Sequence, residues 1–270
     1  NMKPSQNNRL FIKRKVGVFI TALWLLSSGW GLFAQSADQI SKKAADVIDL
    51  SSMTMDFTIN IRDSRGSERV RQLTMITGQF NDVTKTLIRF TAPSDVKGTA
   101  LLIYDYEEKE DDMWIYMPAL KKVRRIISAE RGKSFMGSEF TNADMSKPNH
   151  ADFHYELKGS DTYEGKECWI VQAEGKDQVI KRANGYSRSV SYIDKENYLC
   201  YKTEYYDFSD KLHRIRITSD YKKITETSYF AYHTTMENVK NGRVSEMIVN
   251  QLETGQKYRE SLFSPNALPQ

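Results

Sequence analysis

The 270-residue sequence contains few of the residue types that usually mark a catalytic or metal site. It has two cysteines and four histidines, with no CxxC pair, so no tetrahedral zinc site is expected. His150 and His154 are four residues apart, but their context NHADFH lacks the glutamate of a HExxH zinc motif. The chain also lacks the G-x-S-x-G and G-x-G-x-x-G motifs. We therefore expect no catalytic residue, no bound metal and no cofactor.

Two short segments match catalytic motifs only in part. Residues 94–97 (SDVK) fit S-x-x-K, but the SDN and KTG motifs that accompany it in serine acyl-enzymes are missing. Gly132, Lys133 and Ser134 match the end of a phosphate-binding loop, but Ile127 occupies the place of its first glycine. Both segments are interpreted as turns, and a lipid-directed hydrolase is the weakest of the functions considered.

The first 34 residues have the layout of a secretory signal peptide. Residues 13–15 (KRK) are basic, residues 16–33 are uncharged and mostly apolar, and the small residue Ala34 precedes a polar segment. A transmembrane anchor is the alternative, but the apolar run is short for a membrane span and is interrupted by serines and glycines at 27–31. We expect cleavage after Ala34, which leaves residues 35–270 as one exported domain.

Removing this segment changes the charge balance of the chain. It holds five of the 39 basic residues and no acidic ones, so 34 basic residues remain against 35 acidic ones. Nucleic-acid binding requires a sustained excess of Lys and Arg and is therefore not expected. In an exported chain Cys168 and Cys200 could form a disulfide or remain two buried thiols, and the sequence leaves this open.

Hydrophobic periodicity predicts a mainly β domain. Apolar residues at every second position from Met53 to Ile61 indicate a half-buried strand. Similar runs, separated by turn residues, predict roughly a dozen antiparallel strands in one domain, because no Pro-, Gly- or Ser-rich boundary divides the chain. The expected strands are residues 53–61, 70–80, 84–91, 100–106, 113–117, 123–128, 153–158, 167–174, 187–194, 198–208, 212–221, 229–238 and 243–252, and the expected helices are 38–50, 140–146 and 258–263.

The composition favours an apolar interior surface. The chain has 15 Tyr, 12 Phe and 10 Met, and flexible Met side chains suit pockets that accept variable apolar shapes. Composition alone fits a filled β-barrel core equally well. A long sheet that curls, covered by few helices, has more concave area than its own side chains fill, so a ligand cavity is the preferred interpretation.

Residues 111–145 place an aromatic strand, a basic cluster and a glycine-containing loop next to one another. We interpret residues 132–145 as a mobile lid, because Phe135, Met136 and Phe140 are apolar residues in an otherwise polar loop. The basic cluster, Lys121, Lys122, Arg124 and Arg125, could bind an anionic headgroup or an acidic partner. The alternative for this cluster is a solvated strand edge.

Three blocks in this region carry a family resemblance: residues 90–102 (FTAPSDVKGTALL), 112–126 (DMWIYMPALKKVRRI) and 134–144 (SFMGSEFTNAD). With the closing LFSP at 262–265, they resemble the outer membrane lipoprotein-sorting protein family, a LolA-like group of exported bacterial proteins. The resemblance implies an incomplete, open antiparallel β-barrel of about 11 strands, with helices over its concave face and a hydrophobic cavity inside.

The resemblance also implies a function and a set of site residues. It implies a monomeric, non-catalytic periplasmic carrier of lipid or lipoprotein acyl chains, which exchanges them with an inner-membrane transporter and an outer-membrane acceptor. The alternative is a lipid- or lipoprotein-sensing protein that regulates a membrane partner. Arg89 is the nearest match to the classical carrier's functional arginine. The expected cavity residues are Met55, Phe57, Ile59, Phe90, Leu102, Trp114, Tyr116, Phe135, Met136 and Phe140, and the expected rim residues are Arg89, Lys121, Lys122, Arg124 and Arg125.

Overall fold

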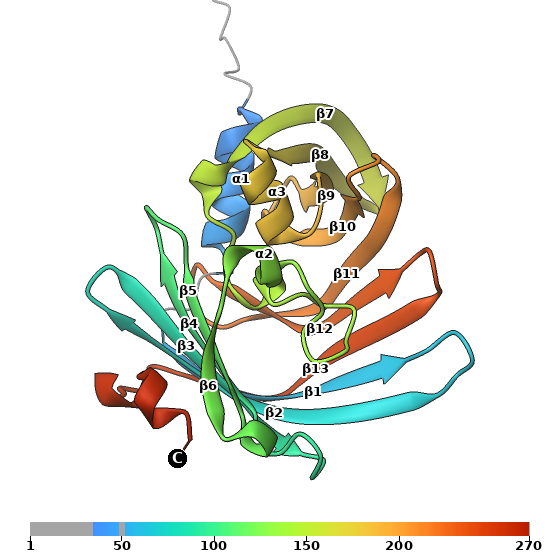
Figure 1. Cartoon of the computed structure of the whole chain (residues 1–270). Coiled ribbons are helices and arrows are strands. Elements are labelled where there is room, and N and C mark those ends of the chain that lie inside the picture. Colours follow the sequence, from blue (N-terminus) through green and yellow to red (C-terminus); the bar gives the residue numbers. More distant parts are fainter. Residues whose placement is uncertain (1–34, 49–51, 270) are drawn as a thin grey trace, which may run out of the picture. The chain divides into compact units, whose positions relative to one another are not determined.

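The computed structural model describes residues 35–48 and 52–269, which form one 13-stranded antiparallel sheet (Figure 1). The predicted mainly β fold, a curved sheet that does not close into a barrel, is confirmed, with 13 strands where about 11 were expected from the resemblance. The predicted signal peptide lies outside the described residues. No helix among the described residues is long and apolar enough to cross a membrane.

The elements follow one another along the chain with short connections, apart from one long segment between β6 and β7. The helices are α1 (Ala37–Asp46), α2 (Ser128–Arg131) and α3 (Gln178–Asn184). Single 3₁₀ turns cover Pro118–Leu120, Ala143–Met145, His150–Asp152, Glu260–Leu262 and Pro265–Ala267. The strands are β1 (Met53–Arg62), β2 (Glu68–Phe80), β3 (Val83–Ala92), β4 (Ala100–Tyr106), β5 (Asp112–Met117), β6 (Lys122–Ile126), β7 (Phe153–Tyr163), β8 (Lys166–Gly175), β9 (Arg188–Asp194), β10 (Cys200–Tyr206), β11 (Leu212–Lys223), β12 (Tyr229–Asn238) and β13 (Arg243–Thr254).

The order of strands in the sheet determines where the long connection must run. The order is β6-β5-β4-β3-β2-β1-β13-β12-β11-β10-β9-β8-β7, so β6 and β7 are the two edges although they are consecutive in sequence. The first and last strands, β1 and β13, pair in the middle of the sheet. Residues 127–152 therefore connect one edge of the curved sheet to the other.

The alternation predicted for β1 is confirmed and identifies the concave face. Met55, Phe57, Ile59 and Ile61 are all buried there in one apolar cluster. The strand register continues this face across the sheet. Ile61 pairs with Ser245 of β13, Ser245 pairs with Met236 of β12, and Met236 pairs with Arg216 of β11, so Arg216 and Arg214, two residues away, also lie on the concave face. This face is thus continuous from apolar strands in the first half of the sheet to more polar strands in the second half.

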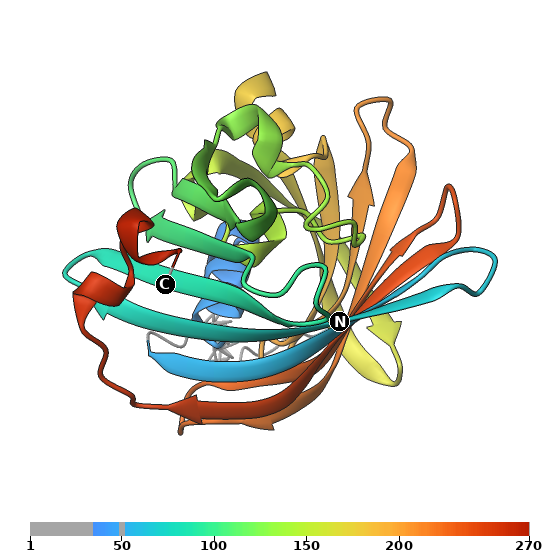
Figure 2. The same ribbon diagram turned by 60° about the horizontal axis from the view of Figure 1, so that its bottom comes forward.

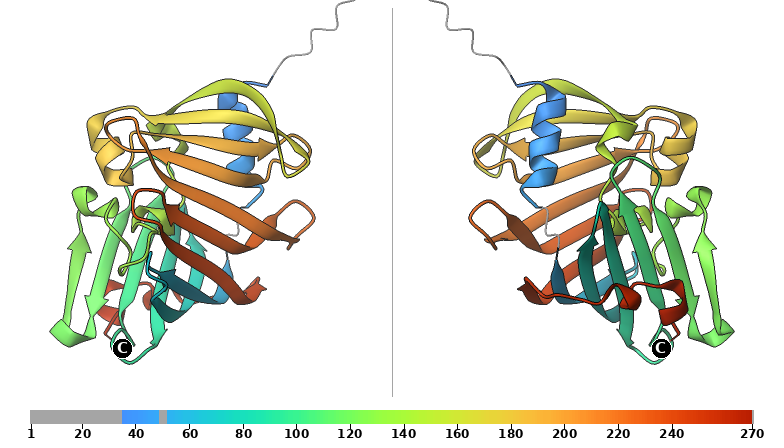
Figure 3. Two further views of the ribbon diagram at one scale, coloured as in Figure 1. Left: turned by 90° about the vertical axis from the view of Figure 1, so that its right-hand side faces the viewer. Right: turned by 90° about the vertical axis from the view of Figure 1, so that its left-hand side faces the viewer.

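Helix α1 lies against the concave face near the β7 edge (Figure 3). Ser36 and Gln39 form a capping box at its start, which satisfies backbone N–H groups that the first turn leaves unpaired. Ile40 is fully buried and packs with Val171 of β8 and Ile193 of β9. The predicted helix at 38–50 is confirmed over 37–46, and residues 49–51 lie outside the described part of the chain.

The C-terminal segment covers the opposite, convex face of β3–β5 (Figure 2). Phe263 and Leu268 are buried against Ala100 and Leu102 of β4, and the Tyr104 hydroxyl donates to the Phe263 carbonyl at 2.5 Å. Strand β4 is therefore covered on both faces, which explains why four of its consecutive residues are buried.

The two other predicted helices are single 3₁₀ turns, and two helices were missed. Helix α3 is framed by residues that sequence reasoning could have used: the Asp177 side chain accepts from the Ile180 N–H at its start, and Gly185 adopts φ +79° just after its end. Because Gly185 is left-handed and its position would bring any Cβ within 2.8 Å of the Gly132 carbonyl, this contact requires glycine. The close contact between Gly185 and Gly132 joins the end of α3 to the segment that crosses the sheet.

Candidate functional site

Residues 132–146, here called the covering segment, lie across the concave face. Ser134 and Thr141 form an antiparallel bridge, and the Phe135 N–H donates to the Phe140 carbonyl at 2.8 Å, which closes a short loop. Met136 (φ +49°) and Gly137 (φ +81°) make its turn. The loop points two aromatic rings into the interior: both Phe135 and Phe140 are at most 3% exposed.

The two phenylalanines occupy different parts of the concave face. Phe135 packs on Phe90 of β3 with ring centroids 5.6 Å apart, inside the apolar cluster built on β1–β5. Phe140 packs instead in a cluster with Tyr205 of β10 and Met236 of β12. The covering segment thus fills interior space in both halves of the sheet with its own side chains.

A buried ion pair holds the covering segment to β11. The Arg214 guanidinium, whose side chain is 3% exposed, pairs with the Asp144 carboxylate at 3.0 Å and donates to the Glu139 carbonyl at 3.0 Å. Asp144 also accepts from the backbone N–H and hydroxyl of Thr141, at 2.7 and 2.8 Å. Removing only one partner of this pair would leave the other as an unpaired charge in low-dielectric surroundings, which is strongly destabilising.

Further polar contacts bind the segment to β12 and β13 at Glu139. The Asn238 amide donates to the Glu139 carboxylate at 2.9 Å, and Arg243 pairs with the same carboxylate at 2.9 Å. The Glu139 N–H donates to the Ser245 hydroxyl at 2.8 Å, and Arg243 donates to the Gly137 carbonyl at 2.7 Å. The segment is therefore held in place by polar contacts around an apolar tip, while its mobility stays a prediction.

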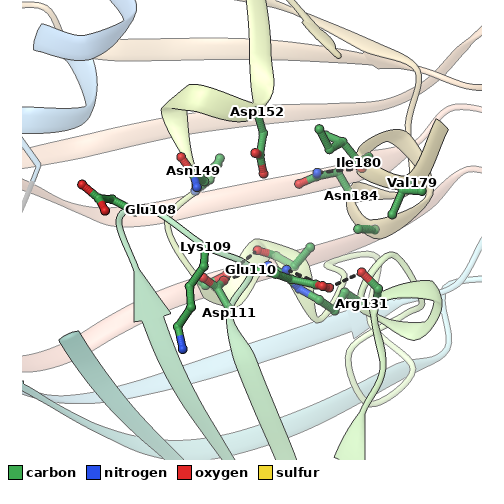
Figure 4. Close-up of a pocket in the computed structure, with 15 residues that line it drawn as sticks. Glu108, Lys109, Glu110, Asp111, Arg131, Asn149, Asp152, Val179, Ile180 and Asn184 are labelled. Carbon is green, nitrogen blue, oxygen red and sulfur yellow. Dashed lines mark hydrogen bonds and ion pairs between the residues drawn. The ribbon is translucent and has the colours of Figure 1, made fainter. Parts of the chain in front are cut away.

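Two adjoining cavities lie beside the covering segment. The outer cavity, of about 170 Å³, lies between α2, α3, the turn from β4 to β5 and the start of β7 (Figure 4). On its wall Arg131 of α2 pairs with the buried Asp111 at 2.7 Å. Burial raises the pKa of Asp111, more than Arg131 lowers it. The inner cavity, of about 160 Å³, shares four wall residues with the outer one: Ala143, Ser146, Pro148 and Asn184.

The inner cavity lies against the concave face of β7–β11. Aromatic rings, hydroxyl groups and one arginine form part of its wall. The cation is Arg216 of β11, which donates to the Thr203 hydroxyl at 3.1 Å. Burial raises the pKa of Tyr155 and of Tyr186, so both phenols remain neutral. The other wall residues are Asp144, Phe153, Ala173, Ser189, Ser191 and Tyr205.

Six of the ten expected cavity residues come together on the concave face. Five are fully or almost fully buried in the cluster of β1–β5, and Met136 packs against that cluster. None of the ten lines either cavity described above. The five are Met55, Phe57, Ile59, Phe90 and Phe135.

Four of the expected cavity residues lie elsewhere. Leu102, Trp114 and Tyr116 belong to the cluster on the convex face, under the C-terminal segment, so their assignment to the concave side is corrected. Trp114 packs there against Tyr104 with ring centroids 4.9 Å apart. Phe140 does face the interior, but in the second half of the sheet.

The expected rim residues also lie at two separate places, neither of which is the rim of a cavity described above. Arg89 neighbours Phe90 and points to the opposite face, where it donates to the Leu268 carbonyl at 3.1 Å. Burial lowers the pKa of Arg89. Its assignment as the rim arginine is corrected, because it anchors the C-terminal segment on the convex side.

The basic cluster lies at the β6 edge of the sheet. Lys121, Lys122, Arg124 and Arg125 are all exposed, and charged side chains on an edge strand protect it from pairing with other chains. Arg124 pairs with Glu130 at 2.7 Å, and Arg125 pairs with Asp112. This position fits the solvated-edge alternative, and binding of a headgroup or partner there stays a prediction.

Sequence reasoning missed the two arginines that face the interior, Arg214 and Arg216. In the β11 sequence LHRIRIT, isoleucines alternate with these arginines, and the alternation predicts that the isoleucines face the core. The structure buries Arg214 because Asp144 and the Glu139 carbonyl reach it from the distant covering segment. Arg216 lies partly buried on the same face, where it donates to the Thr203 hydroxyl. Cys168 and Cys200 are both free thiols, and no group of three or more metal-ligating side chains occurs among residues 35–48 and 52–269.

Comparison with solved structures confirms the resemblance found in the sequence. A domain of an outer membrane lipoprotein-sorting protein from Vibrio parahaemolyticus is 24% identical, with a TM-score of 0.80 over 87% of this chain and 98% of that chain. A DUF1329 family protein from Desulfovibrio piger is 25% identical, with a TM-score of 0.78 over 86% and 97% of the two chains. A LolA superfamily protein from Nitrosomonas europaea is 19% identical, with a TM-score of 0.68 over 86% and 98%.

The first and third of these similarities establish the fold and not the function, because identity is below 25%. No curated protein matches the sequence. A family model described as "-like: Uncharacterized protein" matches residues 82–270, well over half of the chain. The chain therefore belongs to that family, and its fold is the fold of LolA-like, outer membrane lipoprotein-sorting proteins.

Proposed function

We propose that this protein is a periplasmic carrier, which binds the acyl chains of a lipid or lipoprotein beneath the covering segment and moves them towards the outer membrane without a catalytic step. The observation that carries the proposal is the covering segment itself. It inserts Phe135 and Phe140 into a concave, largely apolar face, and polar contacts hold it there. The LolA-like fold of its structural neighbours supports the same function.

Acyl chains would bind by replacing the two phenylalanines. Moving two buried aromatic rings into water costs about 3 to 6 kcal/mol, whereas burying about ten methylenes contributes about 8 kcal/mol. The exchange is therefore favourable for a long chain and unfavourable for a short one. Methionines assist it: Met145 and Met247 pack against the clusters of both halves, and their side chains adapt to different shapes.

Release follows from the same balance. A better acceptor withdraws the chains, and the covering segment then returns to its buried position. The contacts of Glu139 and Asp144 with β11–β13 favour this return, since they are complete only when the segment lies on the concave face. An inner-membrane transporter and an outer-membrane acceptor are the expected donor and acceptor, and the carrier is expected to act as a monomer.

Native mass spectrometry tests the proposal directly. Protein purified from membrane-containing cells is expected to carry lipid, to lose it on extraction and to regain it from vesicles. Chain-length dependence is the sharper readout, because only long acyl chains outweigh the exposure of Phe135 and Phe140. Protein that is free of lipid and takes up none from vesicles would contradict the proposal. Retention of one protein partner without lipid would favour the sensing alternative.

A further inference from the structure

Five arginines leave a buried side-chain nitrogen without a hydrogen-bond partner among the described residues, and one of them differs from the rest. Four of the five pair with a carboxylate, as Arg71 does with Asp95 and Arg214 with Asp144. Arg216 has no carboxylate within ion-pair distance in the described part of the chain. The five are Arg71, Arg131, Arg214, Arg216 and Arg243.

The contacts of Arg216 leave much of its binding capacity unused. Its guanidinium donates once, to the Thr203 hydroxyl at 3.1 Å, and lies 5.8 Å from the centre of the Tyr205 ring. Its Nε has no partner. A guanidinium presents five N–H donors, so several remain free to bind an anion. Arg216 is partly buried and its Nε is fully buried. A cation that is held largely out of water without a counter-ion is unfavourable, and a bound anion would remove that cost.

The surroundings of Arg216 suit an anion with an attached hydrocarbon. Arg216 lines the inner cavity together with the hydroxyls of Ser189, Ser191 and Thr203, which can donate further hydrogen bonds. The rings of Phe153 and Tyr155 supply apolar surface on another part of the wall. A cavity of about 160 Å³ has room for a small headgroup together with the beginning of a chain.

The remaining charge on the wall does not oppose an anion. Asp144 also lines the inner cavity, but Arg214 and Thr141 already occupy its carboxylate. Arg214 pairs with Asp144 from outside the wall and balances its charge. Arg216 therefore leaves a net charge of one positive unit at the cavity, which matches a monoanion.

We propose that the inner cavity binds a monoanionic oxyanion joined to a hydrocarbon chain, either a fatty-acid carboxylate or a phospholipid phosphodiester, with Arg216 as its counter-ion. The inference rests on the proposed function and names the ligand class of its site. The chain would run from Arg216 past Met247 and Met145, which pack against both interior clusters, into the space that Phe140 and Phe135 fill. The outer cavity adjoins this site, since the two cavities share four wall residues.

The test compares two probes with the same chain, oleate and the uncharged monooleoylglycerol, by equilibrium binding at neutral pH. The wild-type protein is expected to prefer oleate. Arg216→Gln is expected to weaken oleate binding by about 10- to 100-fold, since charge-assisted hydrogen bonds are lost, and to leave monooleoylglycerol binding unchanged. Arg65→Gln is the matched control, because the Arg65 side chain is 89% exposed, and it should change neither affinity.

Two further variants keep the test independent of folding. Arg216→Lys retains the cation and should recover part of the oleate affinity. Ser191→Leu leaves Arg216 in place but fills the inner cavity, so it should also weaken oleate binding. Circular dichroism establishes that each variant is folded before its affinity is compared.

The outcomes separate this inference from the proposed function. If Arg216→Gln leaves oleate binding unchanged, or weakens both probes equally, the assignment of the headgroup is wrong and the carrier function stands. If the wild-type protein binds neither probe, the carrier function fails as well. Uptake from phosphatidylglycerol vesicles identifies the phosphodiester source, and rejection of zwitterionic phosphatidylcholine shows that the lipid must carry a net negative charge. Oleate binding without uptake from phosphatidylglycerol identifies the carboxylate. If inorganic phosphate competes as strongly as oleate, the cavity does not require a hydrocarbon chain on its ligand, and that part of the proposal is wrong.

Discussion

The two halves of the concave face differ in what fills them. Over β1–β5 the face is apolar, and Phe135 of the covering segment packs directly on it. Over β9–β11 the face carries Arg214, Arg216 and small hydroxyl residues, and the inner cavity remains beneath the covering segment. One segment covers both halves. Phe135 packs on the first half, whereas in the second half Phe140 packs and Asp144 and Glu139 also make polar contacts.

In the proposed carrier, this difference gives the two halves separate tasks. An apolar surface that is filled by a replaceable ring suits an acyl chain, because burial of methylenes is non-directional and tolerates variation in the ligand. A cavity with one unpaired guanidinium suits a charged headgroup, because hydrogen bonds to a cation are directional and selective. The two interior arginines of β11 make the comparison testable, since they lie on one face of one strand and differ in their partners and in burial: Arg214 is buried and Arg216 is partly exposed.

The largest effect is expected for Phe135→Ala in the apolar half. Removal of a fully buried ring should lower the free energy of unfolding by about 3 to 5 kcal/mol, as measured by urea denaturation. Phe208→Ala is the control, because Phe208 is 55% exposed and its truncation should have little effect. Saturating long-chain lipid should return part of the stability lost in Phe135→Ala. A loss that lipid does not change would argue against replacement of this ring by an acyl chain.

Arg214→Met is expected to destabilise the protein by about 3 kcal/mol, because it leaves Asp144 buried without its cation. The Thr141 hydroxyl and N–H still bind Asp144, which places the effect at the lower end of the range for a broken buried pair. Thermal and urea denaturation measure the loss. Destabilisation below about 0.5 kcal/mol would mean that this pair does not hold the covering segment.

Arg216→Gln should change the free energy of unfolding by only about 1 kcal/mol or less, since it removes one hydrogen bond and no ion pair. The contrast with Arg214→Met, two residues away on the same strand, is the decisive quantity. Equal destabilisation by the two substitutions would show that Arg216 is a structural residue, and would remove the reason to give it a ligand.

The smallest expected effect is a pH dependence of stability that arises from His213, which is next to Arg214 in sequence. Burial, and then the positive charges of Arg214 and Lys240, lower the pKa of His213 below 6.5. As the pH falls, His213 is therefore protonated in the unfolded chain before it is protonated in the folded protein. Proton binding favours the unfolded chain, so the free energy of unfolding decreases as the pH falls from 6.5 through the lowered pKa. His213→Gln should lose less stability than the wild type over that interval. An identical pH profile for the two proteins would contradict the lowered pKa.

Local patterns predicted much of the sheet and little of the site. The alternation at 53–61 predicted β1 correctly because one of its faces is buried and the other is not. At β4 the residues are apolar on both faces, so alternation could not show which of them, Leu101 or Leu102, points to the concave side. The C-terminal segment that covers Leu102 is more than 150 residues away in sequence.

The interior arginines could not be predicted for a related physical reason. An arginine is buried only where a counter-charge or hydrogen-bond acceptor reaches it, and the acceptors for Arg214 come from residues 139 and 144, about 70 positions earlier. The family resemblance gave the fold correctly and led to Arg89, which lies on the other face. Only the three-dimensional register of β10–β13 places Arg214 and Arg216 under the covering segment.

Hydrogen exchange of the covering segment, with and without a long-chain lipid, shows directly whether acyl chains displace it from the concave face. The Glu139 N–H donates to the Ser245 hydroxyl of β13, and this bond breaks when the segment leaves the sheet. The Phe135 and Ser138 N–H groups donate within the buried part of the segment, so displacement should expose all three amides to water. We expect faster exchange at these amides in the lipid-bound protein, with no change in the paired amides of β7 and β8. Lipid binding with unchanged protection across residues 132–146 would contradict it.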